Sequence, residues 1–470
     1  MTGDWRTWLM IGAVGFGGPA GQVAILHREL VERRRWLDED EFLAALRACM
    51  LLPGPEAQQL ATYAGWRRGG LAGGLLAGTL FVLPGAVLVT VLAWLHAAGE
   101  SLPFVGGAFA GTRPAVVALV ALATWRIGRK SLTSPPAVAM VCAAVAALSA
   151  GVAFPVVVLV AGVLGGLLLA PMVKTVSGAK PGSGVKPGAG AETGSGAKPG
   201  SGAVQVAAAR SFGSSRGPRR LGPMLLELAP TPSPPCLDAP RRTSLIGGRF
   251  AEGVWHLAMV VGVAAAIWAA CLWGVTATHA AGGRGGAIAR LFTTTTLLSL
   301  GGAYAVVPWA LDESVARGWL DTDERFTALA MGEATPGPLI LVVTFIGFMA
   351  GWKAVPDAAL YAGLAGGSIA TLFAFLPSFA LIFALAPFVR SIHPGSWLGR
   401  GMAGVGAAVV AAILMLTLRL AHDAFLPAGQ PDLVAIAVAV ASATALISGR
   451  MSTPVVVLAA AAIGAVASLW

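Results

Sequence analysis

The stretch Cys49-Met-Leu-Leu-Pro-Gly-Pro-Glu56-Ala-Gln-Gln-Leu-Ala-Thr62 places two prolines, a glycine and a carboxylate inside an otherwise apolar run. Its Pro-Gly-Pro element occurs again 283 positions later, at residues 336–338. At the same offset, Trp36-Leu37-Asp38 recurs as Trp319-Leu320-Asp321. Because two motifs share one offset, the sequence predicts a duplicated unit.

Composition assigns the chain to the membrane. Hydrophobic residues make up 56% of it and charged residues 11%, with a mean hydropathy of +0.77. A soluble globular domain has roughly 45–50% and about 25%. Runs of about 20 apolar residues, long enough to cross a bilayer, occur at 71–95 and 254–273. We therefore expect an all-α, multi-pass protein of the cell inner membrane. The N-terminus lacks the features of a cleaved signal peptide, so the first apolar segment should remain.

Positive charge is concentrated in one segment. Residues 172–250 hold eleven Lys or Arg against three acidic residues, whereas the whole chain carries +10. Such residues accumulate in cytoplasmic loops, and tracts rich in Gly, Ser and Pro form no core. We predict a disordered cytoplasmic linker at 173–250 and no nucleic-acid partner. It is expected to be a tether, with binding of anionic lipid as the alternative. The linker divides the chain into a first repeat at 1–172, an extra transmembrane segment and loop at 251–290, and a second repeat at 291–470.

Each repeat is predicted to contain six apolar segments. If every segment crosses the membrane, the extra segment makes the second repeat enter inverted. If the Pro-Gly-Pro segment only dips in and returns, each repeat has five crossings and the repeats are parallel. Five arginines within 28–47 favour the dip, whereas inverted repeats are frequent in secondary transporters. We expect inversion. The predicted segments are 5–26, 42–62, 70–95, 104–125, 135–151 and 153–171, then 292–310, 326–349, 361–388, 400–421, 432–448 and 453–470.

The repeated break has a specific chemistry. Proline lacks a backbone N–H and clashes with the preceding turn, so Pro-Gly-Pro ends one helix and starts another. Inside a membrane, such backbone survives only where protein or a water-filled cavity surrounds it. The second half-helix then presents free N–H groups and a partial positive charge, which suit a small oxyanion. Broken helices at matching positions of two repeats indicate a transporter's central site; a kink needed only for packing is the alternative.

Candidate substrate-binding residues lie around both breaks and around two glycine-rich stretches. Polar side chains follow the first break, whereas apolar ones follow the second, so the first copy should carry most of the chemistry. The predicted residues are Gly17, Gly18, Gln22, Pro53, Gly54, Pro55, Gln58, Gln59, Thr62, Gly301, Gly302, Thr335, Pro336, Gly337 and Pro338.

Charged residues near the breaks are candidates for coupling or for a vestibule. Glu56, at the start of a half-helix, occupies the potential that an anion needs. It is either a proton-coupling group or a helix cap, and Glu333 is its nearest equivalent. His27, Arg28 and Glu29 form a vestibule or serve only as interfacial anchors. The four cysteines are far apart, and no metal, cofactor or catalytic constellation is visible, so we expect no enzyme.

At these residues the sequence resembles a family. Gly15-Phe-Gly-Gly-Pro-Ala-Gly-Gln-Val-Ala, His27-Arg-Glu, Trp36-Leu, Met50-Leu-Leu-Pro-Gly-Pro-Glu-Ala-Gln-Gln-Leu-Ala-Thr-Tyr63 and Phe81-Val-Leu-Pro-Gly-Ala86 closely resemble the chromate ion transporter family, in its long-chain two-domain form. Gly301-Gly302, Pro336-Gly-Pro338 and Phe375-Leu-Pro377 resemble its C-terminal domain.

The resemblance implies a secondary transporter that exports chromate and confers chromate resistance, with sulfate as the related oxyanion and no cofactor. Its partners would be chromate or sulfate and the lipid bilayer, and a homo-oligomer is left open. The alternatives are a transporter of sulfate or another oxyanion, and a membrane-embedded enzyme or non-transporting scaffold.

Overall fold

The computed structural model describes residues 4–16, 18–99, 102–132, 134–168, 246–300, 302–391 and 397–469. Within these ranges the regular elements are sixteen α-helices and short 3-10 and π turns, with no strand. The prediction of an all-α fold is confirmed. The described helices belong to one compact unit, within residues 1–174 and 248–470. The predicted linker at 173–250 lies almost wholly outside the described residues.

The helices follow the predicted order of two repeats around one extra segment. Local sequence explains several starts: Asp38 accepts a hydrogen bond from the N–H of Glu41 at 2.7 Å, and proline occupies the first turn of several helices. The first repeat contains α1 (Asp4–Ala13), α2 (Gly18–His27), α3 (Glu39–Leu51), α4 (Glu56–Ala98), α5 (Pro103–Ser131), α6 (Pro135–Ser149) and α7 (Phe154–Leu168). The extra helix is α8 (Ile246–Ala277). The second repeat contains α9 (Gly285–Leu298), α10 (Val307–Ala316), α11 (Glu324–Ala334), α12 (Val342–Trp352), α13 (Ala359–Leu385), α14 (Trp397–Phe425), α15 (Leu433–Ile447) and α16 (Thr453–Ala467).

Helix α4 folds back on itself. Its backbone is non-helical at Gly69 and Gly70, and Gly70 has φ +61°, a conformation that glycine adopts readily. The half-helix 56–68 therefore packs against the long helix 71–98, so closely that a Cβ on Gly65 would lie 2.4 Å from the carbonyl oxygen of Gly73. In the second repeat, α12 and α13 form the equivalent pair.

In the first repeat, both broken segments begin and end at the same end of the helix bundle. Glu41 at the start of α3 accepts hydrogen bonds from Arg67 Nε at 2.5 Å and from Tyr63 at 2.9 Å, both at the far end of the half-helix. Asp4 at the start of α1 pairs with Arg68 at 3.0 Å. The Trp8 and Trp36 rings, near the two ends of the α1–α2 segment, are 5.5 Å apart. Both segments are therefore re-entrant hairpins that open at what we call the Arg68 end.

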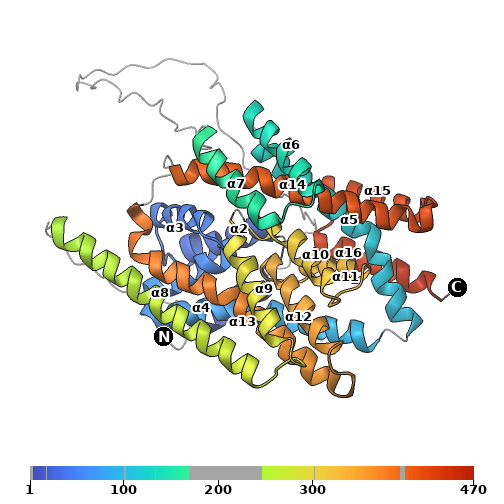
Figure 1. The fold of residues 1–470 in the computed structure, drawn as a ribbon, viewed down its shortest axis with the longest axis horizontal. Helices are drawn as coiled ribbons and strands as arrows, with labels where there is room; N and C mark the ends of the chain where they lie inside the picture. The colour runs from blue at the N-terminus through green and yellow to red at the C-terminus, as the bar shows by residue number, and fades with distance from the viewer. Residues whose placement is uncertain are drawn as a thin grey trace, which may run out of the picture. The chain divides into compact units, whose positions relative to one another are not determined.

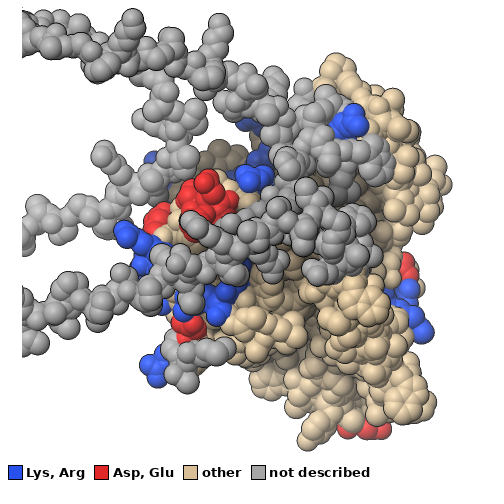
Figure 2. Space-filling view, turned by 90° about the vertical axis from the view of Figure 1, so that its left-hand side faces the viewer, with Lys and Arg blue, Asp and Glu red and all other residues tan. Residues whose placement is uncertain are grey.

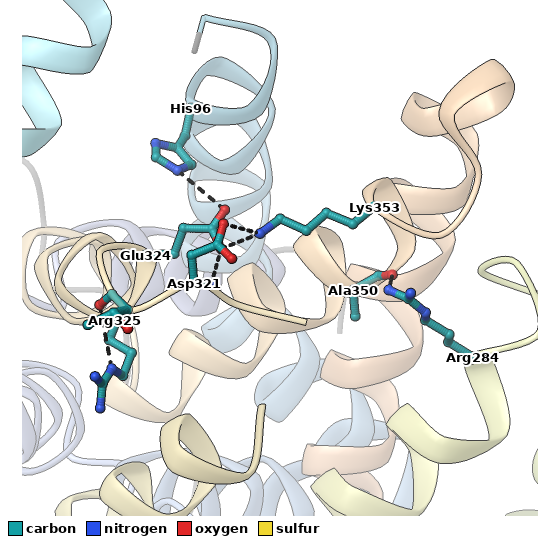
Figure 3. Close-up of polar contacts among 8 residues, drawn as sticks. His96, Arg284, Asp321, Glu324, Arg325, Ala350 and Lys353 are labelled. Atoms are coloured by element: carbon teal, nitrogen blue, oxygen red, sulfur yellow. Dashed lines mark hydrogen bonds and ion pairs between the residues drawn. The ribbon is translucent and has the colours of Figure 1, made fainter. Parts of the chain in front are cut away.

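The second repeat closes its hairpins in the same way. Lys353, just after α12, donates to Asp321 at 2.8 Å and to Glu324 at 2.6 Å, before and at the start of α11. Figure 3 shows Lys353 pointing between these two carboxylates. Arg284, before α9, donates to the carbonyl oxygen of Ala350 at 2.9 Å. Since Glu324 follows Glu41 by 283 positions, the two repeats use equivalent carboxylates.

The two repeats are inverted, as predicted. The long helix 71–98 begins beside Arg68 and ends near His96, whose Nε2 is 3.8 Å from Glu324 (Figure 3). The hairpins of the second repeat therefore open at the opposite end of the bundle, which we call the His96 end. The long helix and α13 run antiparallel, because Gly74 contacts Phe383 and Gly78 contacts Phe379.

The repeats are inverted although the Pro-Gly-Pro segment does not cross the bundle. The sequence alone had linked such a dip to parallel repeats. Both the glycine-rich segment and the Pro-Gly-Pro segment return to the end where they begin. Each repeat therefore loses two crossings instead of one. The number of crossings in a repeat stays even, as it would be if all six segments crossed. The extra helix α8 adds the one crossing that inverts the second repeat.

The outer surface is suited to lipid. Among the described residues, five helices are long and apolar enough to cross a membrane: 56–98, 103–131, 255–277, 356–389 and 400–425. Helix α8 runs along the outer edge of the described helices (Figure 1), and its Trp255 and Trp273 side chains are each 74% exposed. On the face in Figure 2, charged side chains gather in limited regions, and broad areas between them are uncharged. These features confirm a multi-pass membrane protein.

The last helices of each repeat pack on the other repeat. A Cβ on Gly165 of α7 would lie 2.5 Å from the Cα of Gly404 in α14, and a Cβ on Gly111 of α5 would lie 2.6 Å from the Cα of Gly464 in α16. Small residues allow this close approach of membrane helices. The repeats are therefore interlocked.

Candidate functional site

The first Pro-Gly-Pro break is completed by the second repeat. Gly54 has φ +120°, which requires glycine, and donates its backbone N–H to Ser299 Oγ at 2.8 Å. A Cβ on Gly54 would lie 2.7 Å from Ser378 Oγ. Ser299 follows α9 and Ser378 lies within α13, so both partners belong to the second repeat.

The second break is completed by the first repeat. Gly337 has φ +102° and donates its N–H to the carbonyl oxygen of Gly15 at 3.1 Å. The Gln22 amide donates to the carbonyl oxygens of Gly337 and, at 3.2 Å, of Gly15. On the long helix, a Cβ on Gly85 would lie 2.1 Å from the carbonyl oxygen of Pro336.

These contacts follow the internal symmetry of the chain. Ser299 holds the place relative to Gly301-Gly302 that Gly15 holds relative to Gly17-Gly18. Ser378 follows Pro377 as Gly85 follows Pro84. Each break therefore meets the glycine-rich turn and the post-proline position of the other repeat. Sequence reasoning did not identify Ser299 or Ser378, which the repeat register could have indicated.

The polar side chains after the first break form a buried chain of hydrogen bonds. Ser378 Oγ donates to Gln58 Oε1 at 2.8 Å, and Gln58 Nε2 donates to Thr62 Oγ1 at 3.0 Å. Gln59 Nε2 donates to the carbonyl oxygen of Pro53 at 2.8 Å. All three predicted residues, Gln58, Gln59 and Thr62, are fully buried. In this structure they hold the shape of the break, and their contact with a substrate remains a prediction.

Charged groups from three elements gather beside the two breaks. A Cβ built on Gly302 would lie 3.6 Å from Oε1 of Glu56. The half-helix that Glu56 begins has no side-chain hydrogen bond at its N-cap. Tyr304 donates a hydrogen bond to Glu333. On α5, the exposed side chains of Lys130 and Arg126 act through their charge alone, Lys130 on Glu56 and Arg126 on Tyr304 and Glu333.

The sequence reasoning did not select Tyr304, Arg126 or Lys130 as site residues. The two basic residues are four positions apart, and so lie on one face of a helix that is apolar enough to span the membrane. Charged residues in such segments are functional candidates by default, so this spacing was the available signal. No such signal marks Tyr304, which follows the second glycine pair in a short 3-10 turn.

The remaining predicted residues fall into four groups. His27 lies at the Arg68 end, with Nδ1 3.1 Å from Glu32 and Nε2 2.8 Å from Glu39. Beside it Arg28 is exposed, whereas Glu29 is buried and accepts a hydrogen bond from Arg33 at 2.7 Å. These three residues are not brought to the breaks. Pro55, Thr335, Pro336 and Pro338 are buried at the breaks, Gly18 and Gly302 have positive φ, and Gly17 and Gly301 lie outside the described residues.

At the His96 end, where the hairpins of the second repeat open, the surroundings of Glu324 and Lys353 stabilise the charged forms of both side chains. Burial raises the pKa of Glu324, but nearby His96 and the hydrogen bonds from Lys353 and the N–H of Asp321 outweigh this effect, and the pKa falls below its ordinary value of 4.5. Burial lowers the pKa of Lys353, but its bonds to Asp321 and Glu324 outweigh that effect and raise the pKa above 10.5. The ion pair therefore persists over a wide range of pH.

Among the described residues, no three His, Cys, Asp or Glu side chains lie together as a metal site requires. What the breaks offer is different: glycine backbone, half-helix N-termini, and acidic and basic side chains held by two inverted repeats. This combination is typical of membrane transporters built from inverted repeats.

The family model described as chromate transporter matches residues 5–167 and 286–465, and the chain therefore belongs to the chromate transporter family. The two matched segments correspond to the two repeats. They leave out the linker and α8.

Relatives align over most of the chain. The chromate transport protein of Pseudomonas aeruginosa is 28% identical over 423 residues, covering 88% of this chain and 80% of that protein. The chromate transport protein of Cupriavidus metallidurans is 24% identical over 463 residues, covering 98% and 91%. A probable chromate transport protein of Synechococcus elongatus is 26% identical over 408 residues, covering 86% and 81%. No solved structure matches the chain.

Proposed function

We propose that this protein exports chromate across the cytoplasmic membrane and so confers resistance to it. The observation that carries the proposal is the reciprocal completion of the two breaks: Gly54 bonds Ser299, and Gly337 bonds Gly15. Through these bonds, each repeat fixes the start of the half-helix in the other repeat, and the two half-helices are related by the inversion of the repeats. Chromate is a tetrahedral dianion, and half-helix N-termini bind such groups without a metal or cofactor. The names of the aligned relatives support the same cargo.

The substrate would bind between the breaks, beside Arg126 and Lys130 of α5. The charge of Arg126 acts on Glu333, and that of Lys130 acts on Glu56. An entering dianion would compete with the carboxylates for these cations through charge-assisted hydrogen bonds. Proton uptake by Glu56 would remove the competing charge, so coupling to protons and simple structural capping are both consistent with its position.

The membrane potential supplies a driving force for export. A negative-inside potential favours the exit of anions by about 2.3 kcal/mol per charge per 100 mV, and chromate carries two charges. Helix α8 leads into Arg284 at the His96 end, so it starts at the Arg68 end, directly after the basic linker. Because basic residues accumulate in cytoplasmic loops, this supports a cytoplasmic Arg68 end. Chromate would then enter from the Arg68 end and leave at the His96 end.

Uptake of chromate into inverted membrane vesicles tests cargo, direction and driving force together. We expect uptake that rises when the vesicle lumen is made positive and that is absent from vesicles without the protein. Equal uptake with and without the imposed potential would contradict potential-driven export, and no uptake would contradict chromate as cargo. Sulfate has the same shape and charge, so unlabelled sulfate should compete. Transport of sulfate alone would favour the alternative cargo.

A further inference from the structure

A cavity at the His96 end lies apart from the breaks. It has a volume of about 340 Å³ and is lined by Arg325, Leu418, Arg419, His422 and Asp423. A water molecule takes about 30 Å³ in the liquid, so the cavity has room for a small hydrated ion. Three of its five lining side chains are basic types, and one is acidic.

One carboxylate is shared by two guanidinium groups behind this cavity. Asp312 of α10 lies 2.6 Å from Arg419 Nη1 and 3.5 Å from Arg325 Nη1. The other contacts of Arg325 are also long, at 3.3 Å to Asp423 and 3.5 Å to the carbonyl oxygen of Thr322. Its side chain is only 11% exposed. In Figure 3, Arg325 points away from the Lys353 ion pair that joins its neighbour Glu324.

This geometry leaves hydrogen-bonding capacity at the cavity. A guanidinium has five N–H donors in a planar fork, and Arg325 has no contact shorter than 3.3 Å among those given above. Such a fork binds tetrahedral oxyanions in a bidentate manner. The fixed charges of Arg325, Arg419, Asp312 and Asp423 cancel, so an anion must displace a carboxylate. Arg419 is 47% exposed, so water can replace Asp312 as its partner when an anion enters.

We propose that this cavity is a second oxyanion site, at the His96 end, where Arg325 and Arg419 hold a tetrahedral dianion after Asp312 releases Arg419. The identity of the anion as cargo and the assignment of this end as the exit rest on the proposed function. Occupation of the cavity by an oxyanion rests on the geometry alone.

Protection of a cysteine placed in the cavity tests the proposal. Leu418 is 59% exposed and lines the cavity, so Leu418→Cys, in a chain with the native cysteines replaced, should react with a neutral maleimide. Sulfate is the probe, because chromate oxidises thiols, and chloride of equal ionic strength is the control. We expect sulfate to slow the labelling at least threefold. Leu426→Cys, which is exposed just after the same helix, should show no protection.

Two charge variants test whether Arg419 binds the sulfate and whether Asp312 competes with it. Arg419→Gln should abolish the protection of Leu418→Cys, and Asp312→Asn should shift it to lower sulfate concentration. Arg317→Gln, at an exposed pair with Glu313, should leave it unchanged. Labelling that ignores sulfate in a protein that transports chromate would overturn the second site. Protection in a protein that transports no oxyanion would support the site and contradict the proposed function instead.

Discussion

Gly337 donates its backbone N–H to the carbonyl oxygen of Gly15 at 3.1 Å, joining the Pro-Gly-Pro break of one repeat to the glycine-rich turn of the other. The equivalent bond on the other side runs from Gly54 to Ser299 Oγ at 2.8 Å. Neither repeat therefore provides the hydrogen-bond partner for the glycine N–H of its own break. In a membrane, where an unpaired backbone group is costly, this makes the two repeats one structural unit.

Removing the hydroxyl of Ser299 should loosen the first break. In Ser299→Ala the N–H of Gly54 keeps no partner, at a cost of about 1–3 kcal/mol for a buried donor. We expect a lower thermal midpoint in detergent and reduced chromate uptake. Thr294→Ala is the matched control, because its hydroxyl bonds only within the same helix and is exposed. Equal stability of Ser299→Ala and wild type would argue against this bond.

A methyl group at Gly85 should separate the long helix from the second break. Its Cβ would lie 2.1 Å from the carbonyl oxygen of Pro336, and overpacking of this kind typically costs about 1–3 kcal/mol. Gly85→Ala should lower both the thermal midpoint and uptake. Gly106→Ala, where no atom lies within 4 Å, should be neutral or slightly stabilising. If both variants behave alike, the close contact at Gly85 is wrong.

The Glu324–Lys353 pair predicts an acid dependence of stability. Because the pKa of Glu324 is lowered in the folded protein, its contribution is complete above about pH 4.5 and is lost as pH falls through the folded pKa. The contribution of Lys353, whose pKa is raised, is complete below pH 10.5 and is lost as pH rises further. Lys353→Met should therefore flatten the fall of the thermal midpoint below pH 4.5.

The control for this titration is Arg317→Met, which removes a partner from the exposed pair with Glu313 at the same end. Exposed pairs contribute about 0–1 kcal/mol, so its profile should follow wild type. A Lys353→Met profile as steep as wild type on the acid side would show that other carboxylates dominate.

Glu56 distinguishes proton coupling from helix capping. If its protonation admits the anion, Glu56→Gln should transport at all pH values with a flattened pH dependence. If it is a cap, the pH dependence should be unchanged and the thermal midpoint should fall. Uptake by Glu56→Gln and by the exposed control Glu313→Gln, each measured from pH 5.5 to 8.5, separates the two. An unchanged pH dependence removes the coupling role.

Much of the fold could be predicted because duplication leaves a register in the sequence. The offset of 283 relates Pro53 to Pro336 and, in the structure, also relates Glu41 to Glu324. Inversion was predicted correctly, whereas the return of the first two segments was not, because apolar content alone does not tell a crossing helix from a hairpin. The ion pair of Arg67 with Glu41 fixes the return of the Pro-Gly-Pro segment, and its partners are 26 positions apart with no periodic signal.

The sequence predicted the backbone breaks of the candidate site but did not indicate which basic side chains act on its carboxylates. Proline and glycine constrain φ locally, so Gly54 and Gly337 could be read from the sequence. Arg126 and Lys130 act through their charge on Glu333 and Glu56, which lie on other helices, a tertiary relation that local sequence does not encode. The substrate role of all these residues remains a prediction.

The most direct test of the account is the KM for chromate in proteoliposomes of the purified protein with a fixed potential. If the paired breaks and the cations of α5 form one oxyanion site, Arg126→Gln and Lys130→Gln should each raise KM at least tenfold, since a hydrogen bond to a charged group contributes about 1.5–3 kcal/mol. Arg129→Gln, on the same helix and beside Trp125, should leave KM unchanged. A KM that is the same in all three variants and in wild type would contradict the account.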